Sequence, residues 1–340
     1  MKYIDTKEFL ELSNSIPIID VRAPLEYENG HIPGAINIPL FSNEEREKIG
    51  TTYKHVGKLN AIEEGLNFVG PKMSQMAIRG LKVSKKKSLL VHCWRGGMRS
   101  KSMAWLFELM GLHCYVLDGG YKAYRKHGLD EFKNFNRFII LQGATGSGKT
   151  YIIKELAKQG DQVIDLEGLA NHKGSAFGAL GEANQPTTQQ FQNNVFEQFD
   201  KLDKSKHIWL EGESRTIGKV YLPETLWDVM NTSRVVEINI PQEERVKHLL
   251  KDYGKFETTE LIESVEKIRK RFGNDKTKIC VELLQENKLA EVTKMLLDYY
   301  DKAYTFSRDK YKKQKPQQEN FDHMNFDIIA KKLLLTAHKA

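Results

Sequence analysis

The strongest constraint on the fold of this chain is the segment 143–150, which reads Gly-Ala-Thr-Gly-Ser-Gly-Lys-Thr. It satisfies the G-x-x-x-x-G-K-[ST] pattern, follows an apolar strand-like segment (137–142) and precedes a helical one (151–159). Its glycines let backbone N–H groups approach phosphate oxygens, the lysine adds a point charge, and the threonine hydroxyl suits a magnesium ion. The sequence therefore predicts a P-loop NTPase-like α/β domain. Its candidate phosphate-binding residues are Gly143, Gly146, Gly148, Lys149 and Thr150, the last also a candidate magnesium contact.

An acidic residue at the end of a second buried strand usually accompanies such a loop. The apolar run 208–210 ends in Glu211, and Arg215 follows shortly after it. We assign both to phosphate binding. Glu211 stands where an aspartate is commoner, which argues against ordinary ATP hydrolysis. The glycine-rich polar stretch 165–192 predicts a long functional loop, such as a lid over the phosphate.

A second unusual stretch, 89–100, reads as a buried strand, a tight loop and a helix start. Cys93 opens the loop, Gly96 and Gly97 let the backbone N–H groups point inward, and Arg95 and Arg99 add positive charge. These features favour a reactive thiolate. We expect Cys93, Arg95 and Arg99 to be catalytic and the two glycines to bind phosphate. The spacing of Cys93 and Arg99 predicts a loop that encircles a tetrahedral oxyanion.

Composition narrows the setting in which these two loops work. The chain has 340 residues, 40% hydrophobic and 29% charged, with a net charge of +7 and an isoelectric point near 9.0. That mild basic bias permits a polyanionic partner. Three cysteines without a paired spacing argue against a disulfide framework or a zinc site and fit a reducing cytoplasm. No signal peptide or apolar run of membrane-spanning length is present, so we expect no membrane association. Oligomeric state stays open.

The domain boundaries follow from these signals. We place one domain at 1–130 around the Cys93 loop, a P-loop α/β domain at 131–245, and a helical basic region at 246–340 that completes it. Segment 245–315 carries 18 Lys and Arg against 12 Asp and Glu. Its densest basic cluster suits RNA backbone contact, and its aromatic residues suit base stacking, although a solvated helix face with core aromatics is an equal alternative. The candidate RNA-binding residues are Lys267, Arg269, Lys270 and Arg271, and the aromatic residues are Tyr299, Tyr300, Tyr304 and Phe306.

The segment 20–39 contains Asp-Val-Arg, Glu-Tyr, Gly-His-Ile-Pro-Gly-Ala and Asn-Ile-Pro. This closely resembles the first signature of rhodanese-like domains, and Asp-Gly-Gly-Tyr at 118–121 resembles their end. The resemblance covers about residues 1–130 and implies a parallel-sheet domain. It leaves Asp20, Arg22, Glu26 and His31 best interpreted as residues that hold loops in place.

A rhodanese-like domain followed by a P-loop domain is a rare pairing. Together with Gly-Thr-Thr-Tyr-Lys at 50–54, His-Lys-Gly-Ser at 172–175 and Glu-Gly-Glu-Ser-Arg at 211–215, it makes the chain resemble the tRNA 2-selenouridine synthase family over about residues 1–310. The resemblance implies an enzyme acting on tRNA that carries 2-thiouridine at the wobble position. The family geranylates the sulfur with geranyl diphosphate and then replaces it with selenium from selenophosphate. No tightly bound cofactor is implied beyond magnesium at the P-loop.

Two other classes of function remain open from the residues. One is a phosphatase–kinase fusion, with Cys93 as the nucleophile and the P-loop binding ATP. The Cys93 loop contains no Asp or Glu to serve as the general acid that a phosphatase needs. The other is a non-catalytic RNA-binding or sensor protein in which both loops only bind anions.

Overall fold

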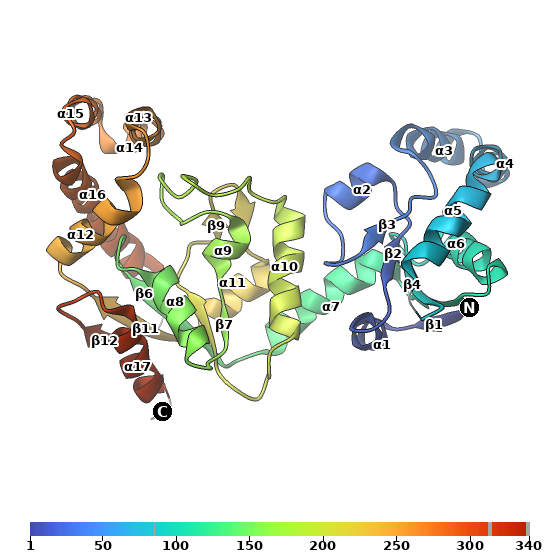
Figure 1. Cartoon of the computed structure of the whole chain (residues 1–340), viewed down its shortest axis with the longest axis horizontal. Helices are drawn as coiled ribbons and strands as arrows, with labels where there is room; N and C mark the ends of the chain where they lie inside the picture. Colours follow the sequence, from blue (N-terminus) through green and yellow to red (C-terminus); the bar gives the residue numbers. More distant parts are fainter. Residues whose placement is uncertain (85, 312–314, 338–340) are drawn as a thin grey trace. The chain divides into compact units, whose positions relative to one another are not determined.

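The computed structural model describes residues 1–84, 86–311 and 315–337, without the side chains of 304–311. The chain forms two compact units, Met1–Glu131 and Phe132–Ala340 (Figure 1). Both are mixed α/β structures built on parallel sheets. None of the described helices has the length and apolar character needed to cross a lipid bilayer.

The first unit is built on a five-stranded sheet with the order β1-β5-β4-β2-β3, in which every neighbouring pair is parallel. Its strands are β1 (Lys2–Ile4), β2 (Ile18–Asp20), β3 (Ile36–Asn37), β4 (Ser88–His92) and β5 (His113–Leu117). Its helices are α1 (Thr6–Ser13), α2 (Pro24–Glu28), α3 (Asn43–His55), α4 (Lys58–Val69), η1 (Gly70–Lys72), α5 (Met73–Val83), α6 (Met98–Leu109) and α7 (Gly120–Asn134), the last of which runs into the second unit.

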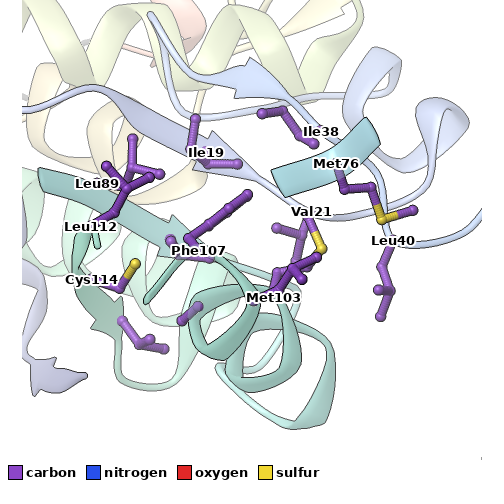
Figure 2. Packing of buried hydrophobic residues seen from close by; sticks show 14 of the residues in the cluster. Ile19, Val21, Ile38, Leu40, Met76, Leu89, Met103, Phe107, Leu112 and Cys114 are labelled. Carbon is purple, nitrogen blue, oxygen red and sulfur yellow. The ribbon is translucent and has the colours of Figure 1, made fainter. Parts of the chain in front are cut away.

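Apolar side chains from the sheet and from α5 and α6 form the core beside the Cys93 loop (Figure 2). Ile19 on β2 and Phe107 on α6 are fully buried in this cluster. A Cβ on Gly80 of α5 would lie 2.4 Å from the Phe107 ring, so this glycine lets α5 pack closely on α6. The helical segment 43–83, which lies between β3 and β4, therefore has two roles. Its charged helix α3 buries no side chain, whereas α5 completes the core.

The second unit has a five-stranded parallel sheet with the order β12-β11-β6-β8-β7. The strands are β6 (Phe138–Gly143), β7 (Val163–Ile164), β8 (Ile208–Glu211), β11 (Arg234–Asn239) and β12 (Gln317–Asn320), with a small hairpin of β9 (Thr216–Ile217) and β10 (Val220–Tyr221). The helices are α8 (Lys149–Lys158), α9 (Leu166–Ala170), α10 (Thr188–Asp200), α11 (Glu224–Met230), α12 (Gln242–Tyr253), α13 (Thr258–Glu266), α14 (Arg269–Phe272), α15 (Asn274–Gln285), α16 (Leu289–Tyr311) and α17 (Phe326–Ala337).

The C-terminal region is helical, and it also supplies part of the sheet. After α16 the chain returns to form the edge strand β12 beside β11, and α17 packs on α8 through Ile329 and Leu333. Helices α13, α15 and α16 build a separate apolar cluster around Val265, Cys280 and Val292. Tyr299 and Tyr300 pack against that cluster, which favours core roles for them. The side chains of Tyr304 and Phe306 lie outside the described residues.

Candidate functional site

The Cys93 loop joins a buried strand to the start of a helix. Strand β4 ends at His92, and α6 begins at Met98. Cys93 is 3% exposed, and its Sγ lies 3.3 Å from the Ser100 hydroxyl oxygen, which donates a hydrogen bond to the carbonyl of Gly97 at 3.0 Å. The sulfur therefore sits at the N-terminus of α6, where backbone N–H groups and the helix dipole favour anions.

Two glycines allow the loop to lie tightly against the segment after β5. Gly96 has φ +66°, and a Cβ there would come within 2.6 Å of the Leu117 carbonyl oxygen. Gly120 has φ +59°, and a Cβ there would lie 2.4 Å from the Cys93 carbonyl oxygen. The Tyr121 N–H donates to that same carbonyl at 2.9 Å. Both positions therefore favour glycine. Residues with a side chain rarely adopt a positive φ, and a Cβ atom at either position would clash with the backbone.

The two arginines of the loop have different environments. Arg95 is exposed, whereas Arg99 is partly buried and donates two hydrogen bonds to the Glu26 carboxylate at 2.5 and 3.2 Å. Burial alone would raise the pKa of Glu26, but the hydrogen bonds and charge of Arg99 outweigh it and hold that pKa below its ordinary value. Glu26 is thus a carboxylate at neutral pH, and it orients Arg99 from α2.

A fully buried ion pair lies in the same unit as the Cys93 loop. Arg22 and Asp20, both fully buried, form a hydrogen-bonded ion pair whose shortest N–O distance is 2.6 Å, and Arg22 also donates to the Gly30 carbonyl at 2.7 Å. The Arg22 guanidinium lies 4.0 Å from the centre of the Tyr121 ring. These contacts agree with the sequence interpretation of Asp20 and Arg22 as residues that hold loops in place.

The P-loop of the second unit connects β6 to α8, as its sequence pattern predicts. Gly146 and Gly148 have φ +77° and +75°, and a Cβ on Gly148 would lie 2.4 Å from the Phe326 ring. A Cβ on Gly143 would lie 2.6 Å from the Ser147 hydroxyl oxygen. The glycines therefore keep the loop close to its neighbours and leave the N-terminus of the ten-residue helix α8 open to an anion.

Lys149 faces carboxylates from other segments of the second unit. Its Nζ lies 3.8 Å from Glu213 Oε1 and donates a long hydrogen bond of 3.5 Å to the Gly143 carbonyl. Burial would lower the pKa of Lys149, but the nearby charges of Glu213, Glu167 and Glu211 outweigh it and raise that pKa. The lysine is therefore a permanent cation at this site.

The carboxylates share buried positions behind the P-loop. Glu211 at the end of β8 is fully buried and accepts a hydrogen bond from the Glu167 backbone N–H at 2.9 Å. Glu167 in turn accepts a hydrogen bond from the Thr150 hydroxyl. Burial, followed by the nearby charge of Glu213, raises the pKa of Glu167 to about 7, and burial also raises that of Glu211 well above its ordinary value. The oxygen-rich group suits the binding of a cation or a proton.

A cavity of about 1040 Å³ opens beside the P-loop. Its polar lining includes Lys149, Thr150, the other residues of the loop and Arg215. Its apolar lining comes mostly from the helices α13, α15 and α16. It contains Phe177, Leu261, Leu284, Leu289, Val292, Leu296 and Leu297. The cavity therefore joins a site for a phosphate group to a site for a hydrocarbon group.

Comparisons with known proteins agree with this two-part architecture. Residues 136–328 match the family described as the tRNA 2-selenouridine synthase AAA domain, and residues 5–127 match the rhodanese-like domain. The chain is 34% identical over 330 residues to a tRNA 2-selenouridine synthase from Sulfurovum sp. (strain NBC37-1), which covers 86% of this chain and 89% of that protein. The chain belongs to the tRNA 2-selenouridine synthase family.

Other relatives extend the match over almost the full length. Identity is 34% to the tRNA 2-selenouridine synthase of Hydrogenovibrio crunogenus (strain DSM 25203 / XCL-2), over 94% of this chain and 96% of that protein. It is also 34% to the enzyme of that name from Shewanella frigidimarina (strain NCIMB 400), over 86% and 89% respectively. Both loops of this synthase-family chain therefore lie within the region it shares with its relatives.

The structure distributes the sequence-predicted residues over three places. Cys93, Arg95, Gly96, Gly97 and Arg99 lie together in the first unit. Gly143, Gly146, Gly148, Lys149, Thr150 and Arg215 line the cavity of the second unit, with Glu211 buried behind Thr150. Lys267, Lys270 and Arg271 are exposed around α14, whereas Arg269 is bound to Glu266 through its Nε at 2.6 Å.

Sequence reasoning missed three parts of this synthase-family site. It assigned no role to Glu167 or Glu213, although each lies at or just beyond the end of a buried strand, where parallel sheets gather functional groups. It also missed the apolar lining of the cavity, because leucines at helical spacing among many lysines read as an ordinary helix core. Trp227, which lines the cavity, carried no motif.

Proposed function

We propose that this chain synthesises 2-selenouridine in tRNA, as the names of its relatives suggest, and that it does so in two steps. First, the sulfur of wobble 2-thiouridine takes a geranyl group from geranyl diphosphate. Second, selenium from selenophosphate replaces the geranylated sulfur. Two candidate anion-binding loops of different design support this division. One carries a cysteine nucleophile, and the other carries a lysine and a threonine hydroxyl that can bind a metal ion.

The observation that carries the proposal is the chemistry of the cavity. Geranyl diphosphate consists of a diphosphate head, which carries two or three negative charges, and a branched hydrocarbon tail. The P-loop and Lys149 suit the head, and the apolar lining from α13, α15 and α16 suits the tail, because burying hydrocarbon there releases water from apolar surface. A nucleotide in the same position would place its polar ribose and base against leucine and valine side chains, which offer no hydrogen bonds.

In the first step the residues of the P-loop stabilise the leaving group. The sulfur attacks the first carbon of the geranyl chain, the carbon–oxygen bond breaks, diphosphate leaves with additional negative charge, and the N3 proton of the base passes to solvent. Lys149 and the N–H groups at the start of α8 face that charge as it develops. Their orientation is fixed before the reaction, because the glycines and the carboxylate contact of Lys149 hold the loop in place.

Magnesium fits this site as a partner of the bound diphosphate. Among the described residues, no group of three or more His, Cys, Asp and Glu side chains is placed to hold a metal alone. The Thr150 hydroxyl and the Glu167 carboxylate are hard oxygen donors, and Glu211 Oε1 is buried without a hydrogen-bond partner. Such a sparse oxygen set suits magnesium, which commonly takes one or two carboxylates together with substrate phosphates. When bound, the ion would neutralise charge on the leaving group.

In the second step the Cys93 thiolate attacks the phosphorus of selenophosphate, so that the phosphorus–selenium bond breaks, hydrogen selenide leaves, and water then hydrolyses the phosphoryl group from the sulfur. The tetrahedral phosphate part fits the loop 93–99, where Arg95 and Arg99 supply positive charge next to the backbone N–H groups. Glu26 fixes Arg99 through two hydrogen bonds, so the position of this cation does not depend on substrate binding. Selenide then replaces geranylthiolate at the C2 carbon of the base.

The structure disfavours the alternative of a phosphatase–kinase fusion. A phosphatase needs a protonated acid beside the leaving group. The carboxylate held against the Cys93 loop is Glu26, and its lowered pKa keeps it ionised and bonded to Arg99. It therefore serves the arginine and has no proton to donate at neutral pH.

Nucleoside mass spectrometry tests the proposed function directly. Thiolated tRNA incubated with the protein and geranyl diphosphate should yield S-geranyl-2-thiouridine, and addition of selenophosphate should convert it to 2-selenouridine. Unthiolated tRNA is the matched control and should gain neither group. Formation of inorganic phosphate from p-nitrophenyl phosphate, with no change in the tRNA nucleosides, would instead identify a phosphatase.

The exposed basic residues around α14 are proposed to contact the tRNA backbone. If they do, tRNA affinity falls steeply with salt, and the double charge reversal Lys270→Glu with Arg271→Glu flattens the slope of log Kd against log salt by about 1 for each phosphate that is no longer neutralised. Arg269→Glu is the comparison variant, because Arg269 is already bound to Glu266. Equal slopes for the wild type and the double variant would show that these residues face solvent and do not contact the tRNA.

A further inference from the structure

The second substrate of the proposed geranyl transfer must enter the same cavity as the first. Reacting atoms have to approach within about 3–3.5 Å, so the C2 sulfur of the base must come close to a carbon bonded to the P-loop-bound diphosphate. A cavity of about 1040 Å³ is at the upper end of the range for a single small ligand, about 300–1000 Å³. It therefore has room for the donor and one extruded nucleobase.

An extruded base loses its stacking in the RNA, so its binding site normally provides an aromatic platform. Six aromatic side chains line the cavity: Tyr151, Phe177, Trp227, His248, Tyr253 and Tyr300. Five of these already contact another aromatic ring, such as Tyr151 on Phe326 with ring centres 5.1 Å apart, and Phe177 on Tyr253 at 5.6 Å. Trp227 stacks on no ring within the part of the chain that the structure describes.

Helix α11 presents Trp227, and the residue that caps its C-terminus, Asn231, adds an amide. Asn231 lies one turn after Trp227, its backbone N–H donates to the Trp227 carbonyl at 3.1 Å, and both side chains line the cavity. Residues four apart lie on the same face of a helix. The neighbouring face carries Leu226 and Met230, which are buried and anchor α11 in the second unit. The Trp227 ring and the Asn231 amide are therefore held on one rigid surface.

We propose that Trp227 and Asn231 form the binding site for the extruded thiolated uracil base, with Trp227 stacking on its face and Asn231 bonding its polar edge. An amide offers a donor and an acceptor, which match the carbonyl and N–H groups along the edge of uracil. Arg215 lies at the cavity, and its pairing with Glu224 is long, at 3.5 Å, and solvent-exposed. Such a pair is weak, so Arg215 is available to a backbone phosphate beside the extruded nucleotide. This assignment rests on the proposed function for its substrates.

The test uses the full chain and a thiolated anticodon stem-loop. Trp227→Ala raises the KM for the stem-loop about 10- to 100-fold in the geranylation assay, the range expected for loss of one base–aromatic stack, and leaves the KM for geranyl diphosphate unchanged. Trp227→Phe retains a stacking face and restores most of the affinity. Trp105→Ala is the matched control, because Trp105 is 51% exposed in the first unit and belongs to neither loop.

A binding measurement separates failure of this inference from failure of the proposed function. Without any donor, the thiolated stem-loop quenches tryptophan emission in the wild type, and Trp227→Phe removes that quenching. An unchanged KM for the stem-loop in a folded Trp227→Ala variant would overturn the inference. A raised KM for geranyl diphosphate alone would overturn it as well and would assign Trp227 to the hydrocarbon tail. If the wild type transfers no geranyl group but shows quenching that Trp227→Phe removes, the base site stands and the proposed function fails.

Discussion

Lys149→Ala is expected to abolish the formation of S-geranyl-2-thiouridine in thiolated tRNA. The charges of Glu213, Glu167 and Glu211 outweigh the effect of burial and raise the pKa of Lys149. Its side chain is therefore positively charged at neutral pH. Removing it takes a fixed charge away from a leaving group that gains charge in the transition state. Losses of this kind commonly reduce kcat by about 10²–10³-fold. Nucleoside mass spectrometry after incubation with geranyl diphosphate measures the effect.

The same variant should separate the two reactions. Given tRNA that already carries S-geranyl-2-thiouridine, together with selenophosphate, Lys149→Ala should still form 2-selenouridine, because the Cys93 loop lies in the other unit. Lys158→Ala is the matched control on the same helix, since Lys158 is exposed and pairs with the neighbouring Glu155 at 2.5 Å. If Lys149→Ala geranylates at the wild-type rate, the P-loop binds another ligand, most plainly a nucleotide, and the division of labour between the loops is wrong.

Local patterns predicted the parts of the fold that short segments determine by themselves. The P-loop and the Cys93 loop are both specified by glycines that no other residue can replace, such as Gly96 against Leu117 and Gly148 against Phe326. The sequence shows such residues directly. Strand β12 was not predicted, because its residues are Gln-Gln-Glu-Asn and carry no apolar signal. It is a strand because β11 offers a free edge with which it pairs in parallel.

The surroundings of the P-loop were harder to predict from the sequence, because they combine distant segments. Glu167, Glu211 and Lys149 come from three segments that meet only because β7, β8 and β6 are neighbours in the sheet. The apolar lining of the cavity was not predicted, because its residues recur with the spacing of an ordinary helix core. Leu284 and Leu296 have the spacing of a helix core, and only the folded arrangement brings them to the same cavity as the P-loop. Such a lining has no motif, because hydrocarbon recognition depends on burial and needs no special residue.

The chain offers internal standards for testing its reactive cysteine. Burial raises the pKa of Cys114 to about 12 and that of Cys280 to about 11, so both remain protonated thiols at neutral pH. Cys93 and Cys114 both belong to the core cluster of the first unit, but Cys93 also begins the candidate anion-binding loop directly after β4. Variants of Cys93 and Cys114 therefore compare a candidate nucleophile with a structural thiol in one fold.

Cys93→Ser is expected to block selenium incorporation while leaving geranylation intact, so that S-geranyl-2-thiouridine accumulates. Serine preserves the shape of the loop and its proximity to Ser100, where the sulfur now lies 3.3 Å from the hydroxyl oxygen, but it supplies no thiolate. Removal of an essential nucleophile lowers kcat by about 10³-fold or more. Cys114→Ala should retain selenation, apart from a loss of stability that a thermal melt can measure separately. Selenation by Cys93→Ser at the wild-type rate would mean that selenide reaches the C2 carbon without a cysteine, and that the loop only binds the phosphate part of selenophosphate.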